Sequence, residues 1–518
     1  MKKIIKNIKS LLLFGVMVMI GTSCSDFLVE NPKSDISLIS YFTDKEHAYT
    51  AVNRLYRDGP YDIYNGYGSA YSGSIGMVYD HLSGFYNNEY KGQELYVIAA
   101  QNLDVDASQL NDVANSIWSS QYYEISNANT AIKGIPEVPE LNDDEKNYQI
   151  AQAKFFRAFS YFILLRTFGD VPLITEPYES VENVYVARTA SLDVYNQVIE
   201  DLEFASLYLK DKVMEANSGR VTKGAAQTLL AEVYLSMSGY PLNVDRYAEA
   251  ATQAKEVISS GVYDLLTNDD NTTGSAYNKM RSETNDDSKE YIYYIEYLEG
   301  ESNSPYASWS LPSNNIHSNI GIHVNTFEPM QELIDLYDSS NDLRVKENQF
   351  YYSTLGGDAF DAWAPWLWFN DHAHESSISS KNFVVYRYTD VLLIAAESLA
   401  RSGGSLSEAA GYLAKVKARA SLNLSESEII TALSSLSVQE FIEEVWTERY
   451  RESAFEFKAW FTMIRTKKYP VGDGSGSVNY VDLIGHTNRW GATYTERDLL
   501  WQLPEQEMQK NPDLIPNP

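Results

Sequence analysis

Three tryptophans lie within six residues in the stretch AWAPWLWFN, as Trp363, Trp366 and Trp368. Tyr306 and Trp309 lie upstream in SPYASWSLP. A flat aromatic ring can stack on the apolar face of a pyranose, and nearby carboxylates and amides can hydrogen-bond its hydroxyl groups. The chemistry that these residues favour is therefore sugar binding. Packing is the alternative, because three tryptophans so close together cannot all point the same way.

A second run of tyrosines is interleaved with glycine in residues 58–90 and fits no helical stripe. Tyr67, Tyr71 and Tyr86 from this run join the five residues above as candidate ligand-binding aromatics. Both groups fall in long irregular segments, and binding residues concentrate in long loops that a packed scaffold holds in place. The chain has 39 Tyr against 19 Phe, which favours a surface that is wet and adhesive.

Residue types suited to catalysis are present, but their spacing is not that of a catalytic site. None of the seven His lies in a hydrolase or metalloprotease motif. His372 and His374 lack a third ligand at metal-binding spacing. In EEVWTERYRESAFEFKAWFTMIR, the carboxylates from Glu443 to Glu452 are interpreted as ion-pair partners that tie a helix to its neighbours. We therefore expect no catalytic residue, no metal and no cofactor.

Cys24 is the sole cysteine of the chain, and it follows a segment with the features of a secretory signal. Four lysines precede an apolar run at 11–20, which is too short to cross a bilayer, and small residues follow at 21–23. A cysteine at the first mature position can carry acyl chains that anchor a protein to a membrane. We expect a signal peptide at 1–23, a lipid on Cys24 and a leash at 24–43. An ordinary signal peptide with a free thiol is the alternative.

The chain is strongly acidic, with 41 Lys and Arg, 71 Asp and Glu, and a formal net charge of −30. The signal segment holds four of the basic residues and no acidic one, so its removal brings the net charge to −34. Nucleic acid is excluded as a partner, because its binding needs a basic surface. An acidic polysaccharide would be repelled, which favours a neutral sugar as ligand.

The elements that must hold these residues are mostly helices. Apolar periodicity predicts helices at 44–57, 111–135, 191–209, 222–238, 245–259, 389–401 and 407–420, and a long one at 438–466. A helix in 151–174, ended by Gly169 and Pro172, is apolar on two sides and therefore lies between neighbours. Several helices form antiparallel pairs with small Ala residues inside, which is typical of degenerate tetratricopeptide-type pairs. Strands are expected at 291–297 and 383–388.

The fold class expected is therefore mainly α, with tetratricopeptide-like helix pairs, long loop-rich segments and a few short strands. We predict one domain over 44–518. Its helical scaffold covers about 44–57, 109–260 and 389–466, and its ligand-binding loops cover about 58–108 and 262–384.

Several stretches in this order resemble the SusD/RagB family, the outer-membrane nutrient-uptake lipoproteins of Bacteroidetes. They include CSDFLVENP, AQAKFFRAFSYFILLRTFGDVPLI, YRYTDVLLIAAESLAR and WQLPEQEMQKNPDLIPNP. The resemblance implies a SusD-like fold, a cell-surface location through lipid on Cys24, and a SusC-like TonB-dependent transporter as partner. It implies that the protein captures an oligosaccharide, or in some members a peptide, and presents it for import without catalysis. The ligand aromatics of the family do not transfer by motif.

Two other functions stay open from the residues alone. A surface glycoside hydrolase would need two carboxyl groups about 5–9.5 Å apart in an aromatic cleft. A tetratricopeptide-type scaffold would bind a peptide or protein on its concave helix faces, away from the tryptophan loop.

Overall fold

The computed structural model describes residues 41–65, 73–92, 94–178, 184–211, 219–285, 288–312, 324–376 and 378–517. Nineteen α-helices and eight short strands make up the secondary structure of these residues, so the prediction of a mainly α fold is confirmed. Cys24 and the predicted leash lie outside the described residues, except for its last three positions. Within the described residues, no helix is long and apolar enough to cross a bilayer.

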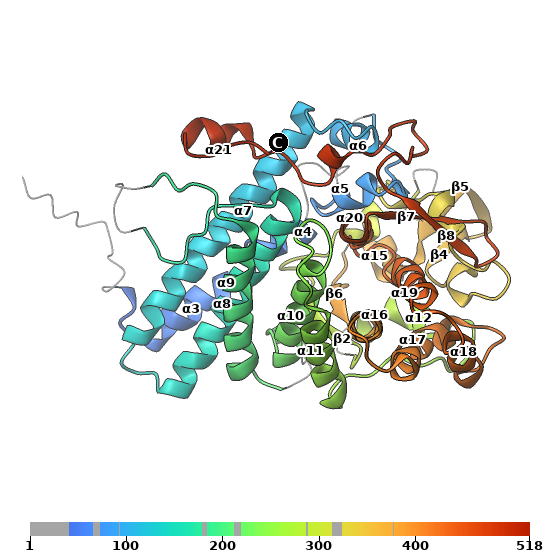
Figure 1. Cartoon of the computed structure of the whole chain (residues 1–518), viewed down its shortest axis with the longest axis horizontal. Helices are drawn as coiled ribbons and strands as arrows, with labels where there is room; N and C mark the ends of the chain where they lie inside the picture. Colours follow the sequence, from blue (N-terminus) through green and yellow to red (C-terminus); the bar gives the residue numbers. More distant parts are fainter. Residues whose placement is uncertain are drawn as a thin grey trace, which may run out of the picture.

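A row of paired helices forms the scaffold (Figure 1). Most of them contact the next helix in the row, which confirms the predicted helix pairs. The helices are α3 (Lys45–Arg54), α7 (Ser108–Gly134), α8 (Asp143–Phe168), α9 (Ser191–Tyr208), α10 (Lys223–Met237), α11 (Tyr247–Ser259), α16 (Tyr388–Arg401), α17 (Leu406–Ala420), α18 (Glu426–Leu433), α19 (Val438–Glu452) and α20 (Ala459–Thr466). Helix α18 was not expected from the sequence.

Helix α8 lies between α7 and α9, as its two apolar sides predict. Asn142 and Glu145 form a capping box at its start, and nearly every side chain from Gln149 to Phe168 is buried. The helix ends at Gly169, which adopts a φ of 74° that other residues rarely take. The buried Arg157 of α8 donates two hydrogen bonds to Asp201 of α9, at 2.7 and 2.8 Å. Packing and this ion pair together fix the angle between the two helices.

The predicted long helix at 438–466 is wrong, because the chain forms α19 and α20 with a break at 453–458. Phe455 and Phe457 have φ values of 67° and 59°, in the left-handed region that ends a helix. Distant partners hold this conformation. The Phe455 amide donates to the Tyr86 hydroxyl at 3.0 Å, and the Arg387 guanidinium donates to the carbonyl oxygen of Glu452 at 2.6 Å. Tertiary contacts have therefore overridden a continuous helical pattern.

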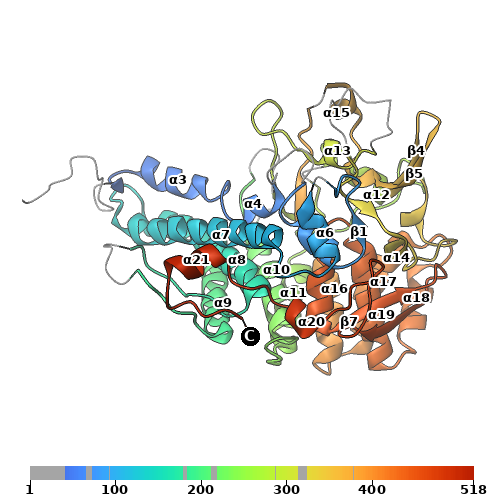
Figure 2. The same cartoon turned by 90° about the horizontal axis from the view of Figure 1, so that it is seen from above.

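Shorter elements cover one side of the scaffold (Figure 2). The strands form four antiparallel two-stranded sheets: β1 (Tyr86–Asn87) with β3 (Glu328–Pro329), β2 (Tyr291–Ile295) with β6 (Phe383–Arg387), β4 (Tyr351–Leu355) with β5 (Asp358–Pro365), and β7 (Lys468–Gly472) with β8 (Val478–Asp482). The short helices are α4 (Pro60–Tyr64), α5 (Met77–Leu82), α6 (Leu95–Gln101), α12 (Ala276–Met280), α13 (Tyr306–Trp309), α14 (Gln331–Ile334), α15 (Asp371–Ser376) and α21 (Glu505–Lys510), with five 3-10 turns among the described residues. Strands β2 and β6 confirm both predicted strands, whereas β5 replaces an expected loop.

A buried carboxylate joins the scaffold to these shorter elements. Glu452, at the end of α19, is fully buried and accepts hydrogen bonds from Arg344 at 2.9 Å, from Arg387 at 2.8 Å and from Arg419. These arginines belong to the 3-10 helix η4 (Leu343–Val345), β6 and α17. Burial disfavours a charged carboxylate, but the guanidinium groups of Arg419, Arg387 and Arg344 together lower the pKa of Glu452 to about 2.

Further carboxylates complete the charge balance of this cluster. Glu290 accepts from Arg387 at 3.0 Å and from Arg419 at 2.6 Å. Arg344 pairs in turn with Asp342 and Glu448, each at 2.7 Å. The charges on α19 therefore tie the helix to its neighbours, as the sequence indicated, but they do so inside the protein.

We expect Glu452→Gln to lower the free energy of unfolding by about 3–5 kcal/mol, because three buried guanidinium groups lose a shared anion. Urea denaturation at neutral pH measures the change. Glu443→Gln is the matched control on the same helix, where the carboxylate is half-exposed and accepts from Gln439. Its effect should stay below about 0.5 kcal/mol.

The difference in stability between the wild type and Glu452→Gln should depend on pH. The folded-state pKa of Glu452 lies near 2 and its ordinary value is 4.5, so the stabilisation by its charged carboxylate is fully present above about pH 4.5 and is lost as the pH falls towards 2. The wild type should lose more stability across this window than Glu452→Gln. Parallel losses in the two proteins would contradict a dominant role for the charged form of Glu452.

Candidate functional site

Most of the predicted ligand aromatics are packed in the interior. Tyr306 is 0 % exposed, and its ring stacks on Trp368 with 4.4 Å between centroids. Trp368 in turn stacks on Phe383 at 5.3 Å, and Trp309 meets the edge of Tyr306 at the same separation. The hydroxyl of Tyr306 donates to the carbonyl oxygen of Tyr64. As packed, Tyr306, Trp309 and Trp368 offer no open ring face to a ligand.

Trp366 is also buried, in a small separate cluster with Tyr352 and Phe369. Its ring stacks on Phe369 at 4.2 Å, and the guanidinium of Arg281 lies 4.8 Å from the ring centroid. Two of the three clustered tryptophans therefore serve packing, which is the alternative that their spacing left open.

The predicted tyrosines give a similar result where they can be placed. Tyr86 is 2 % exposed, and its hydroxyl accepts the hydrogen bond that holds Phe455 in its left-handed conformation. Tyr67 and Tyr71 lie outside the described residues. Burial argues against direct ligand contact by Tyr86 in this conformation.

Trp363 is the predicted aromatic that remains half-exposed. It lies near the end of β5, with the buried ring of Tyr351 beneath it at 6.3 Å in an edge-to-face arrangement. The β4–β5 hairpin fixes the strand by pairing Tyr351 with Pro365 and Tyr352 with Ala364. One side of Trp363 is thus supported by the core while the other remains accessible.

Asn325 connects Trp363 to a second loop. Its side-chain amide donates to the carbonyl oxygen of Trp363 at 3.0 Å. Its backbone exchanges two hydrogen bonds with Glu89, one to the Glu89 carboxylate at 3.2 Å and one from the Glu89 amide at 3.1 Å. Among the described residues, the buried side-chain oxygen Oδ1 of Asn325 has no hydrogen-bond partner. An unsatisfied acceptor of this kind is costly, so the position calls for a donor such as a hydroxyl group or a water.

Charged groups border the Trp363 side chain and Asn325. Glu328 accepts from Asn87 at 2.6 Å, and burial, reinforced by Glu89, raises its pKa. Lys91 lies 5.9 Å from the ring of Trp490, the other half-exposed tryptophan among the described residues. Acidic and basic groups alternate here, so the surface has no single strong charge.

We define the Trp363 face as Trp363, Asn325 and Glu89. It combines a supported aromatic ring with an exposed carboxylate, which suits stacking and hydrogen bonding of a sugar ring, while the buried Asn325 joins the two loops. Sequence reasoning found the tryptophan but missed Asn325 and Glu89. No local pattern marks them, because their contact spans 236 residues.

The candidate metal ligands do not converge. His372 lies on the surface of α15, 3.5 Å from Glu299, while His374 is buried with its ring edge against Phe369. In the part of the chain that the structure describes, no group of three or more His, Cys, Asp or Glu side chains is arranged to hold a metal ion.

Comparison with protein families gives two matches. Residues 62–235 match the SusD-like family described as starch-binding and associating with the outer membrane. Residues 368–518 match the SusD family. The two segments together include most of the helical scaffold.

Individual proteins agree with the family matches. SusD-like protein P2 of Formosa agariphila is 26 % identical over 436 residues, covering 79 % of this chain and 80 % of that protein. The crystal structure of a SusD superfamily protein from Parabacteroides distasonis superposes with a TM-score of 0.80 at 29 % identity, covering 91 % of this chain and 98 % of that one. Surface glycan-binding protein A of Bacteroides thetaiotaomicron, solved with laminarihexaose, shares the fold with a TM-score of 0.70 at 19 % identity, covering 92 % of this chain and all of that chain.

The stabilities of two variants should distinguish a packed tryptophan from an accessible one. We expect Trp368→Ala to lower the free energy of unfolding by about 3–5 kcal/mol, because it empties the centre of a ring stack. Trp363→Ala should cost less than about 1 kcal/mol, since its side chain already lies partly at the surface. Urea denaturation of both variants checks the difference, and equal losses would place Trp363 in the core.

Proposed function

Because this chain belongs to the SusD family, we propose that it is a cell-surface lipoprotein that binds an oligosaccharide and delivers it to a SusC-like TonB-dependent transporter. The family is associated with the outer membrane, which supports attachment through a lipid on Cys24. Residues 24–43 then form the leash of a single binding domain over 44–518.

The observation that carries the binding role is the Trp363 face. A ring exposed on one side and supported on the other can stack without reorganising the protein, and preorganisation lowers the cost of binding. The exposed carboxylate of Glu89 can accept hydrogen bonds from the hydroxyl groups of a sugar, and Asn325 links the Glu89 loop to the backbone of Trp363.

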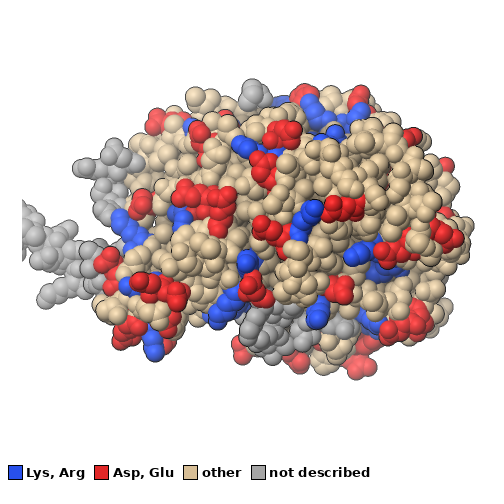
Figure 3. Space-filling model, turned by 60° about the horizontal axis from the view of Figure 1, so that its bottom comes forward, with Lys and Arg blue, Asp and Glu red and all other residues tan. Residues whose placement is uncertain are grey.

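The cargo that the surface favours is neutral. In the face drawn in Figure 3, Lys and Arg side chains lie scattered among Asp and Glu, with no broad basic patch. A net charge of −30 repels polyanions unless a local basic site compensates. A neutral oligosaccharide is therefore our first choice, and a peptide remains the second candidate, because the same face could stack an aromatic side chain.

Binding without turnover is the further part of the proposal. A glycoside hydrolase needs two carboxyl groups in a cleft that the substrate enters. Two carboxylates of α19, on Glu448 and Glu452, are enclosed and paired with guanidinium groups, where they stabilise the fold.

Native affinity electrophoresis of residues 25–518 against neutral and acidic polysaccharides tests the binding role. We expect one or more neutral glycans to retard the wild type, with no reducing ends appearing. Trp363→Ala should weaken binding about fivefold or more, since aromatic contacts contribute about 1 kcal/mol. Trp490→Ala is the matched control, because this tryptophan is also partly exposed and is not part of the Trp363 face.

The alternatives give different results in the same experiment. Release of reducing ends would establish a hydrolase. Failure of every glycan, with calorimetric binding of peptides, would move the cargo to the peptide class. Equal effects of Trp363→Ala and Trp490→Ala would remove the Trp363 face from the binding site.

Lipid attachment is tested separately in the native bacterium. Cys24→Ser removes the thiol that would carry the lipid, so the full-length protein should move from the outer-membrane fraction to the soluble fraction. The affinity of the variant for the glycan that retards the wild type should stay unchanged, because Cys24 is not part of the Trp363 face. Co-purification of the wild type with a large outer-membrane barrel would support the transporter partner. A membrane-bound Cys24→Ser protein would contradict the anchor.

A further inference from the structure

A pocket of about 490 Å³ lies far from the Trp363 face, towards the other end of the long axis (Figure 1). Three segments distant in sequence form it: α7, the chain after α8 at 172–178 and 184–186, and the C-terminal segment that begins with α21. None of the predicted ligand aromatics lines it. The volume falls in the range of about 300–1,000 Å³ that small-molecule sites occupy.

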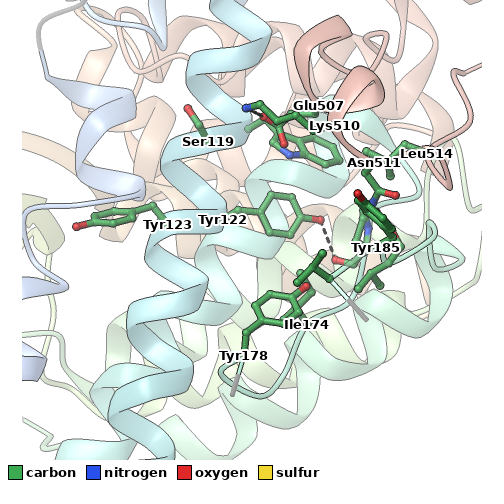
Figure 4. A pocket seen from close by; sticks show the side chains of 14 residues that line it. Ser119, Tyr122, Tyr123, Ile174, Tyr178, Tyr185, Glu507, Lys510, Asn511 and Leu514 are labelled. Carbon is green, nitrogen blue, oxygen red and sulfur yellow. Dashed lines mark hydrogen bonds and ion pairs between the residues drawn. The ribbon is translucent and has the colours of Figure 1, made fainter. Parts of the chain in front are cut away.

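Aromatic rings form the walls of this pocket (Figure 4). Trp118 and Tyr122 come from α7, with 4.8 Å between their ring centroids. The Tyr122 hydroxyl donates to the carbonyl oxygen of Pro172 at 2.8 Å, which fixes the ring. Tyr178 and Tyr185 stand across from them on the second segment. The rings therefore face the space between α7 and residues 172–178 and 184–186.

The exposure of these tyrosines is unusual in this protein. Tyr178 is 49 % exposed and Tyr185 is 55 % exposed. Among the described residues, three tyrosines are this open to solvent, and all three line this pocket. The third, Tyr123, lies at its margin and points away from the centre, where Arg54 covers its ring at 4.9 Å. Apolar surface gathered in one hollow and left open is typical of a contact site.

The electrostatics of the pocket favour an uncharged occupant. The charged side chains among its described lining residues are Glu507 and Lys510, and they pair with each other at 2.7 Å on α21. The two opposite charges therefore give the described lining no net charge. The hydroxyl groups of Tyr178 and Tyr185 supply polar contacts beside apolar ring faces.

The C-terminal wall is held in place by hydrogen bonds. The Asn511 side chain donates to the carbonyl oxygen of Val186 at 2.9 Å, and the backbone amide of Glu505 donates to Asn111 of α7 at 3.0 Å. Arg188 donates to the carbonyl oxygen of Ile515 at 2.8 Å. These bonds hold the three walls together, so the pocket is formed before any ligand arrives.

We propose that this pocket is a second glycan site, which binds a neutral pyranose unit between the rings of Tyr122, Tyr178 and Tyr185. The inference rests on the proposed function and adds a site to it. Ring faces, hydroxyl groups and the balanced charge of the described lining residues favour a neutral sugar over an acidic sugar or an ionic peptide. Because the two sites lie apart, a short oligosaccharide would occupy each of them independently.

Isothermal titration calorimetry of residues 25–518 tests the proposal. The probe is the shortest oligosaccharide that binds the wild type, taken from a neutral polysaccharide that retards the wild type in electrophoresis. We expect two molecules bound per wild-type chain, one for the double variant Tyr178→Ala, Tyr185→Ala, one for Trp363→Ala and none for all three changes combined. Tyr123→Ala is the matched control and should keep two. Both pocket tyrosines are half-exposed, so thermal melting of the double variant should match the wild type.

The outcomes separate the two proposals. The second site would be overturned if the wild-type chain bound one oligosaccharide, and if Trp363→Ala lost it while the double tyrosine variant kept it. The proposed function would then stand. One molecule lost in the tyrosine variant alone would support the pocket and exclude the Trp363 face. No retention of any glycan would refute the proposed function, and the inference with it.

Discussion

Glu452 is the group on which the arrangement of this molecule depends. Its buried carboxylate holds guanidinium groups from η4, β6 and α17 around the end of α19. Apolar packing tolerates small sliding movements, but a buried anion shared by three cations does not, because each displaced charge would stand unpaired. The cluster therefore fixes where the shorter elements lie on the helical scaffold.

The consequences of this constraint extend to the Trp363 face. Arg387 binds the carboxylate of Glu452 and also the last carbonyl oxygen of α19, so the helix ends there and the chain turns through Phe455 and Phe457. The Phe455 ring then packs edge to face on Tyr351 at 5.4 Å, and Tyr351 packs edge to face on Trp363 at 6.3 Å. These rings connect the break after α19 to the β4–β5 hairpin. A charge cluster in the interior thus positions an aromatic surface through a chain of direct contacts.

The parts of this architecture that the sequence predicted are those with local causes. The scaffold helices follow from apolar periodicity, and α8 shows its two buried sides in the spacing of Phe155, Phe156 and Phe159. The break after α19 has no local signal, since FKAWF continues the helical pattern while the cause, Arg387, lies 65 residues away. Distant contacts also decide which tryptophans are buried and which is accessible. Trp368 is buried by Tyr306 and Phe383, whereas Trp363 is left open by the course of the β4–β5 hairpin.

Composition suggested that the many tyrosines form an adhesive surface, but the structure gives another reason for their number. Most described tyrosines are buried, and many hydroxyls donate to backbone carbonyl oxygens in irregular segments or at the ends of short helices: Tyr306 to Tyr64, Tyr122 to Pro172, Tyr161 to Ile174, and Tyr494 to Leu82. A loop packed against a core needs partners for its peptide groups, because no regular ladder supplies them. Tyrosine provides the ring for the core and the hydroxyl for the loop. In a chain that uses tyrosine this way, solvent-exposed rings are exceptions to the packing rule. Their concentration at one pocket therefore carries more information about ligand binding than the total number of aromatic residues does.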